Sequence, residues 1–136
     1  IIKKHYKDAI LIGNHILNRN NWTTQIPHRL CIATNMTPKN DLDFCNIYFR
    51  PKEWFEKISS EIIKKDFSSY NIESLLPSLC LADLILYKEH FHGLHIDDYE
   101  IPDEDKEDFK RACKTLTIPE NICDEWLNYY NTPKIR

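Results

Sequence analysis

The stretch Asn21-Trp-Thr-Thr-Gln-Ile-Pro-His-Arg-Leu-Cys-Ile-Ala-Thr34 carries the clearest structural signal in the sequence. It begins as a polar turn that Pro27 stiffens, and it continues as alternating apolar and polar side chains. This alternation predicts a half-buried strand over His28–Thr34. Because a helical pattern precedes the stretch and a second strand-like run follows it, we predict an α+β domain.

The flanking regions predict the remaining elements. Apolar spacing predicts a helix over residues 3–19, and alternation predicts a second strand, Asp43–Arg50, that pairs antiparallel with the first. Pro51 suits the first position of a short helix, Lys52–Ile58. Two short strands and three helices are predicted further along: Glu61–Asp66, Tyr70–Leu75, Ser78–His90, Asp103–Leu116 and Pro119–Asn131. The fold class is therefore α+β, with a small, mainly antiparallel sheet packed against helices and a helical C-terminal part.

Length and composition indicate one globular domain over residues 1–136. The chain is 42% hydrophobic and 29% charged, which is typical of a folded protein rather than a disordered one. It has only two glycines, Gly13 and Gly93, which argues against a glycine-rich phosphate loop. No apolar run approaches the roughly 18 residues of a membrane span, and no signal-peptide pattern is present. Because the chain starts at Ile1 rather than Met, we expect further sequence upstream.

The cysteines indicate a reducing compartment. There are five of them, an odd number, and they are widely spaced within apolar runs: Cys31, Cys45, Cys80, Cys113 and Cys123. A free thiol in such a run behaves as a small hydrophobic side chain. We therefore expect free cysteines and a cytoplasmic protein.

Charge is distributed unevenly along the chain. Residues 1–65 hold 11 Lys/Arg and 6 Asp/Glu, whereas residues 66–136 hold 7 Lys/Arg and 15 Asp/Glu. Such asymmetry indicates either a basic face and an acidic face for different partners or two solvated faces of one domain.

A histidine-rich segment is the first candidate site. His90, His92 and His95 lie close to Asp97 and Asp98, and imidazoles and carboxylates are suitable ligands for zinc or another divalent ion. The spacing matches no structural zinc motif. The same histidines can instead cap the last carbonyl groups of the preceding helix.

Two enzymatic alternatives have weaker patterns. A magnesium-dependent nuclease needs acidic residues beside a lysine, and Asp43, Lys52 and Glu53 are the nearest match in the strand region. A thiol nucleophile needs a neighbouring base, which His28 would supply to Cys31 if the strand geometry allows it. No elbow glycine or oxyanion-hole motif accompanies these residues.

Contact with nucleic acid is a further candidate function. Cations neutralise phosphates and aromatic rings stack on bases. The cations that could do so in the strand region are His28, Arg29, Arg50, Lys52, Lys64 and Lys65, with Trp22, Tyr48 and Trp54 nearby. The sequence pI of about 6.1 argues against a dedicated nucleic-acid module.

Several stretches between Ala9 and Leu86 are together similar to one known family. They are Ile10-Leu-Ile-Gly13 with Asn14-His-Ile-Leu17, Trp22-Thr-Thr-Gln-Ile-Pro27, Arg29-Leu-Cys-Ile-Ala-Thr34, Ile47-Tyr-Phe-Arg-Pro-Lys-Glu-Trp-Phe55 and Leu81-Ala-Asp-Leu-Ile-Leu86. In this order they resemble the C-terminal domain of the abortive-infection AbiEi-type (type IV) antitoxin family. The resemblance implies an α/β domain that normally follows a promoter-binding winged helix. It also implies a role against a nucleotidyltransferase-type toxin encoded beside it, without obligatory direct binding. It includes neither a winged helix nor residues 90–136.

These observations favour a non-enzymatic, antitoxin-like regulatory interaction domain without a cofactor. The expected contacts are the basic strand surface around Arg29 and Arg50 and the acidic region Asp97–Asp108. The alternative is a metal-dependent nuclease or hydrolase that uses the histidine cluster with Asp97. A host-directed or phage-derived inhibitor domain is a third reading.

Overall fold

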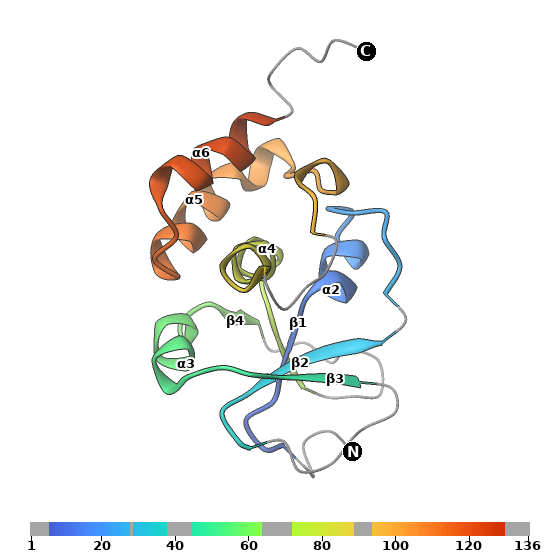
Figure 1. Cartoon of the computed structure of the whole chain (residues 1–136), viewed down its shortest axis with the longest axis vertical. Helices are drawn as coiled ribbons and strands as arrows, with labels where there is room; N and C mark the ends of the chain where they lie inside the picture. Colours follow the sequence, from blue (N-terminus) through green and yellow to red (C-terminus); the bar gives the residue numbers. More distant parts are fainter. Residues whose placement is uncertain (1–5, 28, 38–44, 64–71, 89–93, 130–136) are drawn as a thin grey trace.

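The computed structural model describes residues 6–27, 29–37, 45–63, 72–88 and 94–129 (Figure 1). In these segments a five-stranded sheet has the order β3-β2-β1-β5-β4. The strands are β1 (Ile10–Ile12), β2 (Leu30–Thr34), β3 (Cys45–Phe49), β4 (Ile62–Ile63) and β5 (Glu73–Leu75). The helices are α2 (Asn14–Arg19), α3 (Lys52–Ile58), α4 (Pro77–Leu86), α5 (Lys106–Thr115) and α6 (Glu120–Asn128), with short 3₁₀ turns η2 (Ile96–Asp98) and η3 (Asp103–Asp105). The α+β class is confirmed.

The sheet is mixed rather than mainly antiparallel. Strand β1 is antiparallel to β2 and parallel to β5, whereas β4 is antiparallel to β5. Strand β3 runs parallel to β2, so the antiparallel pairing predicted for these two strands is wrong. The connection from Thr34 to Cys45 is longer than a tight hairpin, and the chain returns to the starting end of β2 before β3 begins.

The predicted helix over residues 3–19 is wrong in its central part. Ile10–Ile12 forms β1, the middle strand of the sheet, and only Asn14–Arg19 is helical. Both faces of β1 are buried, so its side chains form a continuous apolar run that does not distinguish a strand from a helix. Gly13 separates the two elements with a φ of 85°, a conformation that a side chain disfavours. A Cβ atom at this position would also lie 3.3 Å from the Cβ of Cys31.

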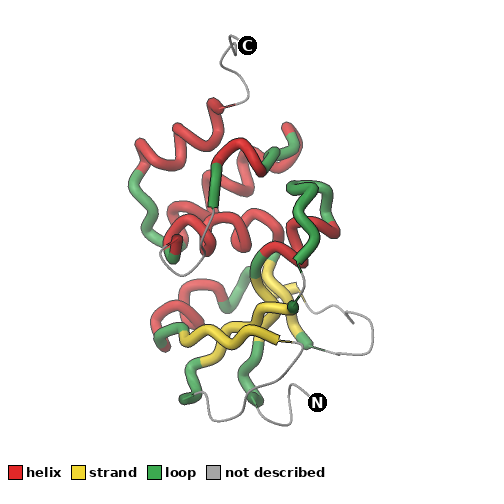
Figure 2. The backbone as a smooth tube through the Cα atoms, turned by 45° about the vertical axis from the view of Figure 1, so that its right-hand side comes forward, coloured by secondary structure: helices red, strands yellow, loops and turns green. Residues whose placement is uncertain are grey.

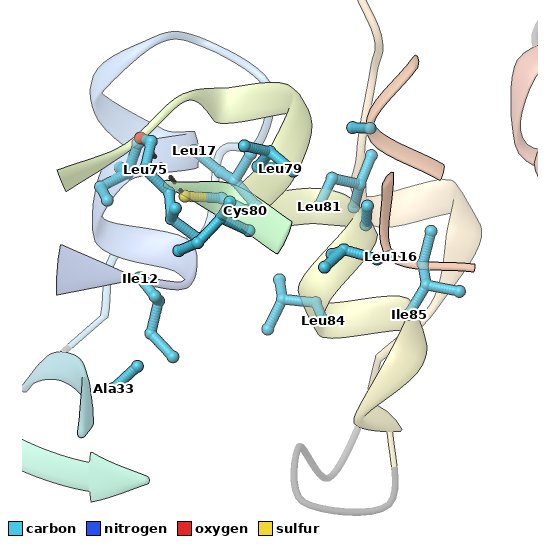
Figure 3. Packing of buried hydrophobic residues seen from close by; sticks show 14 of the residues in the cluster. Ile12, Leu17, Ala33, Leu75, Leu79, Cys80, Leu81, Leu84, Ile85 and Leu116 are labelled. Carbon is cyan, nitrogen blue, oxygen red and sulfur yellow. Dashed lines mark hydrogen bonds between the residues drawn. The ribbon is translucent and has the colours of Figure 1, made fainter. Parts of the chain in front are cut away.

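Helix α4 is the centre of the molecule. Every residue from Ser78 to Ile85 is buried, and the helix lies between the sheet and the α5–α6 pair (Figure 1). Figure 3 shows Cys80 beside Leu75 of the sheet, where the thiol donates to the carbonyl of Leu75 (3.7 Å). The predicted helix Ser78–His90 is confirmed in its first part, since α4 ends at Leu86 and His90 lies outside the described residues.

The C-terminal helices form a second layer over α4. Figure 2 shows the strands gathered in one part of the molecule, with α5 and α6 in the other. One hydrophobic cluster nevertheless extends from Tyr6 to Leu127 and includes residues of both parts. In the described segments, no helix has the length and apolar character needed to cross a lipid bilayer.

Candidate functional site

An open pocket of about 540 Å³ lies where the C-terminal end of α4, the segment 94–96 and α6 meet. We call it the α4–α6 pocket. Its lining is mostly apolar, and Lys88, His95 and Glu125 are the charged or titratable residues in it. The full lining consists of Ile85, Leu86, Lys88, Leu94, His95, Ile96, Ile118, Pro119, Ile122, Glu125 and Trp126. This volume falls in the range of about 300–1,000 Å³ that is typical of binding pockets.

The α6 wall of the pocket follows from the turn between α5 and α6. Helix α5 ends with two reverse hydrogen bonds, from the N–H of Ile118 to the carbonyl of Cys113 (2.8 Å) and from the N–H of Thr117 to the carbonyl of Lys114 (3.1 Å). This arrangement is a Schellman motif, and Thr117 has the left-handed φ of 61° that the motif requires. The turn places Ile118 at the pocket, and Ile122 then follows at helical spacing.

The opposite wall belongs to the end of α4. Ile85 is buried, whereas Leu86 is 41% exposed although it is a large apolar side chain. Such a residue is common singly on a surface, but here it adjoins a larger apolar lining that includes Trp126. Ile122 of α6 is only partly buried and also lines the pocket.

Charged groups border this apolar lining. Lys88 follows α4 and His95 lies in the segment before η2, whereas Glu125 belongs to α6. None of the three forms an ion pair with another residue in the described part of the chain. The lining therefore combines Lys88 and His95, from the end of α4 and segment 94–96, with the carboxylate of Glu125 on α6, and all three residues are exposed to solvent.

The turn that contains Thr-Gln-Ile-Pro supports the segment beside the pocket. The Thr23 hydroxyl donates a hydrogen bond to the backbone carbonyl of Asp98 (2.9 Å), and the Gln25 side-chain amide donates to the Asp98 carboxylate (3.1 Å). The N–H of Glu100 donates to the carbonyl of Trp22 (2.8 Å). The turn therefore holds Asp98 in place. The two segments are more than 70 residues apart in the chain, so no local sequence pattern indicates this contact.

Tyr99 connects this polar bridge to the pocket. Its hydroxyl donates to the side-chain oxygen of Asn14 (2.7 Å), and Asn14 in turn donates to Gln25 (3.2 Å). The ring is 2% exposed, and its centroid lies 6.0 Å from that of Trp126 in the pocket wall. Burial raises the pKa of Tyr99 to about 12, although the contact with Asn14 acts in the opposite direction.

The predicted metal cluster is only partly visible. His95 and Asp97 are described and exposed, whereas His90 and His92 lie outside the described residues. Asp98 is partly buried and contacts Gln25. Within the described segments, no group of three or more His, Cys, Asp or Glu side chains is arranged to hold a metal ion.

Arg50 corrects the expectation of a basic surface. Its side chain and that of Asp83 are both 0% exposed, and they form a bidentate ion pair with N–O distances of 3.1 and 3.0 Å. The indole N–H of Trp54 donates to the same carboxylate (2.8 Å). The Arg50 guanidinium also donates to the carbonyl of Phe49 (3.0 Å) and lies 3.7 Å from the centroid of the Tyr87 ring. Arg50 is therefore inside the protein and holds the β3–α3 step against α4.

The other predicted contact residues are scattered. Arg29 is exposed and donates to the carbonyl of Cys45 (3.4 Å), and Lys52 is exposed at the start of α3. His28, Lys64 and Lys65 lie outside the described residues, as does Asp43 of the nuclease alternative. Without Arg50, the described basic surface is smaller than the sequence suggests.

Part of the acidic region is paired with basic residues of α5. Lys106, Lys110 and Arg111 form ion pairs three residues apart along the chain, with Asp103 (3.0 Å), Glu107 (3.2 Å) and Asp108 (2.7 Å) respectively. These contacts are exposed and of the kind that contributes little to stability. They reduce the net negative charge that the stretch presents to a partner.

The thiols are poorly suited to nucleophilic chemistry. All five cysteines are free. Burial raises the pKa of Cys31 to about 11 and that of Cys45 to about 12, and it also raises the pKa of the other three thiols. A thiolate is the reactive form, so these groups stay protonated near neutral pH. The hydroxyl groups of Ser74 and Ser78 are also buried.

Comparisons with known proteins found no family model that matches the chain and no curated protein that matches its sequence. The similarity to the AbiEi-type antitoxin family therefore stays a prediction that rests on the quoted stretches.

Proposed function

We propose that this chain is a non-enzymatic interaction domain of a cytoplasmic toxin–antitoxin or defence system, and that a protein partner docks at the α4–α6 pocket. The observation that supports the proposal is the pocket itself, an open apolar lining of about 540 Å³ bordered by charged groups that lack ion pairs within the described residues.

Burial of the apolar pocket lining by a partner would be favourable for two reasons. Removing apolar surface from water contributes roughly 25 cal/mol per Å², and Leu86 and Ile122 supply such surface in one place. Tryptophan in a desolvated pocket is also a frequent anchor of protein interfaces. Trp126 is held in position by Tyr99, which makes the site pre-organised.

The antitoxin-like assignment draws on the sequence resemblance. The Thr-Gln-Ile-Pro turn that carries it is also the part that supports the segment beside the pocket. A binding role fits the described titratable groups better than a catalytic one, because the thiols are protonated and Asp98 is engaged by Gln25. Direct binding and antagonism of a nucleotidyltransferase-type toxin are both parts of the proposal.

Growth rescue tests the proposal in the cell. The full chain is co-expressed with the product of the neighbouring gene, and we expect it to relieve growth arrest that this product causes alone. Affinity purification of the tagged chain then identifies bound protein and nucleic acid. Absence of rescue together with a chain that purifies without any neighbouring-gene product would overturn the proposed function.

Two pocket variants and a matched control make the test specific. Leu86→Glu and Ile122→Glu place a charge on the apolar lining, whereas Asn121→Glu places the same charge on an exposed position of α6 outside the pocket. We expect the purified partner to bind the wild type and Asn121→Glu but not the two pocket variants. Stoichiometric zinc or manganese that is lost in a His92→Ala/His95→Ala variant would instead favour the metal-dependent enzyme.

A further inference from the structure

The structure also restricts what kind of partner segment the α4–α6 pocket can take. We propose that the pocket binds an amphipathic helix that carries acidic residues on one flank of its apolar face and basic residues on the other. This inference rests on the proposed function, because it assumes that the pocket is a protein-docking site.

The pocket favours a helix over an extended strand. Its walls are the end of α4, the segment 94–96 and α6, and no strand of the described sheet contributes to the lining. An added strand needs the unpaired N–H and C=O groups of a sheet edge to satisfy its backbone. A helix satisfies its own backbone hydrogen bonds and needs from its receptor only an apolar groove.

The rim favours a partner that carries both signs of charge. Lys88 follows the end of α4 and His95 belongs to segment 94–96, whereas Glu125 belongs to α6. A purely anionic ligand, such as a nucleic-acid backbone or a fatty acid, would meet Glu125 without compensation. A helix with an acidic flank and a basic flank meets complementary charge on both walls.

The apolar contacts define the anchor positions of that helix. Leu86 at one wall and Ile122 and Trp126 at the other face the same pocket. Large apolar side chains at positions i, i+3, i+4 and i+7 lie on one helix face and match such a groove. The volume of about 540 Å³ accommodates anchor side chains rather than a whole helix, so the flanks stay at the rim.

Designed peptides test this arrangement on the full chain. Three fluorescein-labelled peptides of about 15 residues, long enough for helix formation, share one apolar stripe. The first carries Glu on one flank and Lys on the other, the second carries Glu on both flanks, and the third carries Lys on both. A fourth keeps the mixed flanks but replaces the stripe with serine. Fluorescence anisotropy gives the Kd of each.

We expect the mixed-flank peptide to bind most tightly and the serine peptide not to bind. Each exposed ion pair should change Kd by about two- to fivefold. Leu86→Glu and Ile122→Glu should weaken binding by at least about tenfold, whereas Asn121→Glu should not, since one buried apolar anchor is worth a factor of this size. Leu86→Glu keeps the test valid if Ile122→Glu perturbs folding, because Leu86 is already 41% exposed.

A charge exchange tests the orientation of the rim. Lys88→Glu makes the α4 wall acidic, so the all-Lys peptide should become the tighter ligand. Lys114→Glu, an exposed lysine outside the pocket, should leave the order unchanged. Equal affinity for all flank patterns, or binding that the pocket variants do not weaken, would overturn the inference.

The two proposals fail in different ways. If the chain relieves growth arrest but binds none of the helical peptides, the helix inference is overturned and the proposed function stands. If the chain binds the mixed-flank peptide with the expected dependence on Lys88 but neither relieves growth arrest nor recovers the neighbouring-gene product, the proposed function is overturned and the pocket chemistry stands.

Discussion

Asp83 and Leu86 lie within one turn of α4, yet their environments are the reverse of what their side chains prefer. Asp83 is a carboxylate with 0% exposure, whereas Leu86 is an apolar side chain that is 41% exposed. Asp83 is compensated inside the protein by Arg50 and Trp54. Leu86 is not covered by any part of the chain that the structure describes and opens into the α4–α6 pocket.

The difference separates a structural site from the proposed interaction site. A buried charge whose hydrogen bonds are satisfied within the fold leaves nothing for a ligand to contact. An apolar lining beside charges without ion pairs gains energy only when something else covers it. Residues that break the usual burial pattern therefore indicate function only after their internal contacts have been traced.

The largest expected effect is the removal of Asp83. Asp83→Ala leaves the Arg50 guanidinium buried without its counterion, so we expect a loss of about 3–5 kcal/mol in the free energy of unfolding. Chemical denaturation measures it. Asp124→Ala, at an exposed position of α6, is the control and should change stability by less than about 0.5 kcal/mol. A small effect of Asp83→Ala would contradict the comparison of Asp83 with Leu86, because the contacts of Asp83 with Arg50 and Trp54 would then not be required for stability.

Removal of both charges should cost much less than removal of one. Arg50→Met/Asp83→Leu eliminates the ion pair and replaces it with apolar volume, which is often nearly neutral in stability for buried pairs. We expect the double variant to recover most of the loss seen in Asp83→Ala. Trp54 retains an indole N–H without its acceptor, for which a residual loss of about 1–3 kcal/mol is expected. If the loss of stability in the double variant equalled the sum of the losses in Arg50→Met and Asp83→Leu, the expected coupling would be contradicted.

Tyr99→Phe tests the bridge that supports the pocket wall. Loss of the hydroxyl removes the hydrogen bond to Asn14, and we expect a decrease of about 0.5–1.5 kcal/mol at pH 7. The pKa of Tyr99 is raised to about 12 from the ordinary value of 10, so its folded form holds the proton more tightly than the unfolded form.

That shift has a defined consequence for stability at high pH. The contribution of Tyr99 is fully present below pH 10 and is lost as the pH rises through about 12. The stability difference between wild type and Tyr99→Phe should therefore shrink above pH 10. Denaturation curves of both proteins measured side by side cancel the titration of the other tyrosines and cysteines. A constant difference would contradict the raised pKa.

The smallest expected effect on stability concerns the pocket. Leu86→Gln should change the free energy of unfolding by less than about 0.5 kcal/mol, because the side chain is already substantially exposed. Leu84→Ala, on the same helix but 1% exposed, should cost about 2–5 kcal/mol. Leu86→Gln should nevertheless reduce the affinity for the partner or peptide, although its folding stays intact. A strong loss of stability in Leu86→Gln would indicate a structural rather than a binding role.

Local patterns predicted several elements well. The alternation in His28–Thr34 and Asp43–Arg50 corresponds to β2 and β3, and the predicted helix Lys52–Ile58 is α3. Pro51, Pro77 and Pro119 lie where helices begin, because a fixed φ and a missing N–H suit those positions. The apolar stripes of the last two predicted helices correspond to α5 and α6.

The candidate site was much less accessible from the sequence. The burial of Arg50 depends on Asp83, which is 33 residues away in the chain, and no local pattern connects them. The pocket combines α4, segment 94–96 and α6, whose apolar residues each look like ordinary core positions within their own helix or turn. Leu86 and Ile122 differ from core residues because the described part of the chain covers them only partly.

The sequence by itself determined the type of an element, strand or helix, wherever local signals decide it. These signals are side-chain periodicity, proline and glycine, and they act over a few residues. The sequence determined β2, β3 and the α3–α6 helices for this reason. Tertiary structure decided the parallel pairing of β2 with β3, the strand conformation of Ile10–Ile12 and the placement of Arg50 inside the core. Each of these depends on hydrogen bonds and burial between residues far apart in the chain, and such contacts leave no periodic trace in the local sequence.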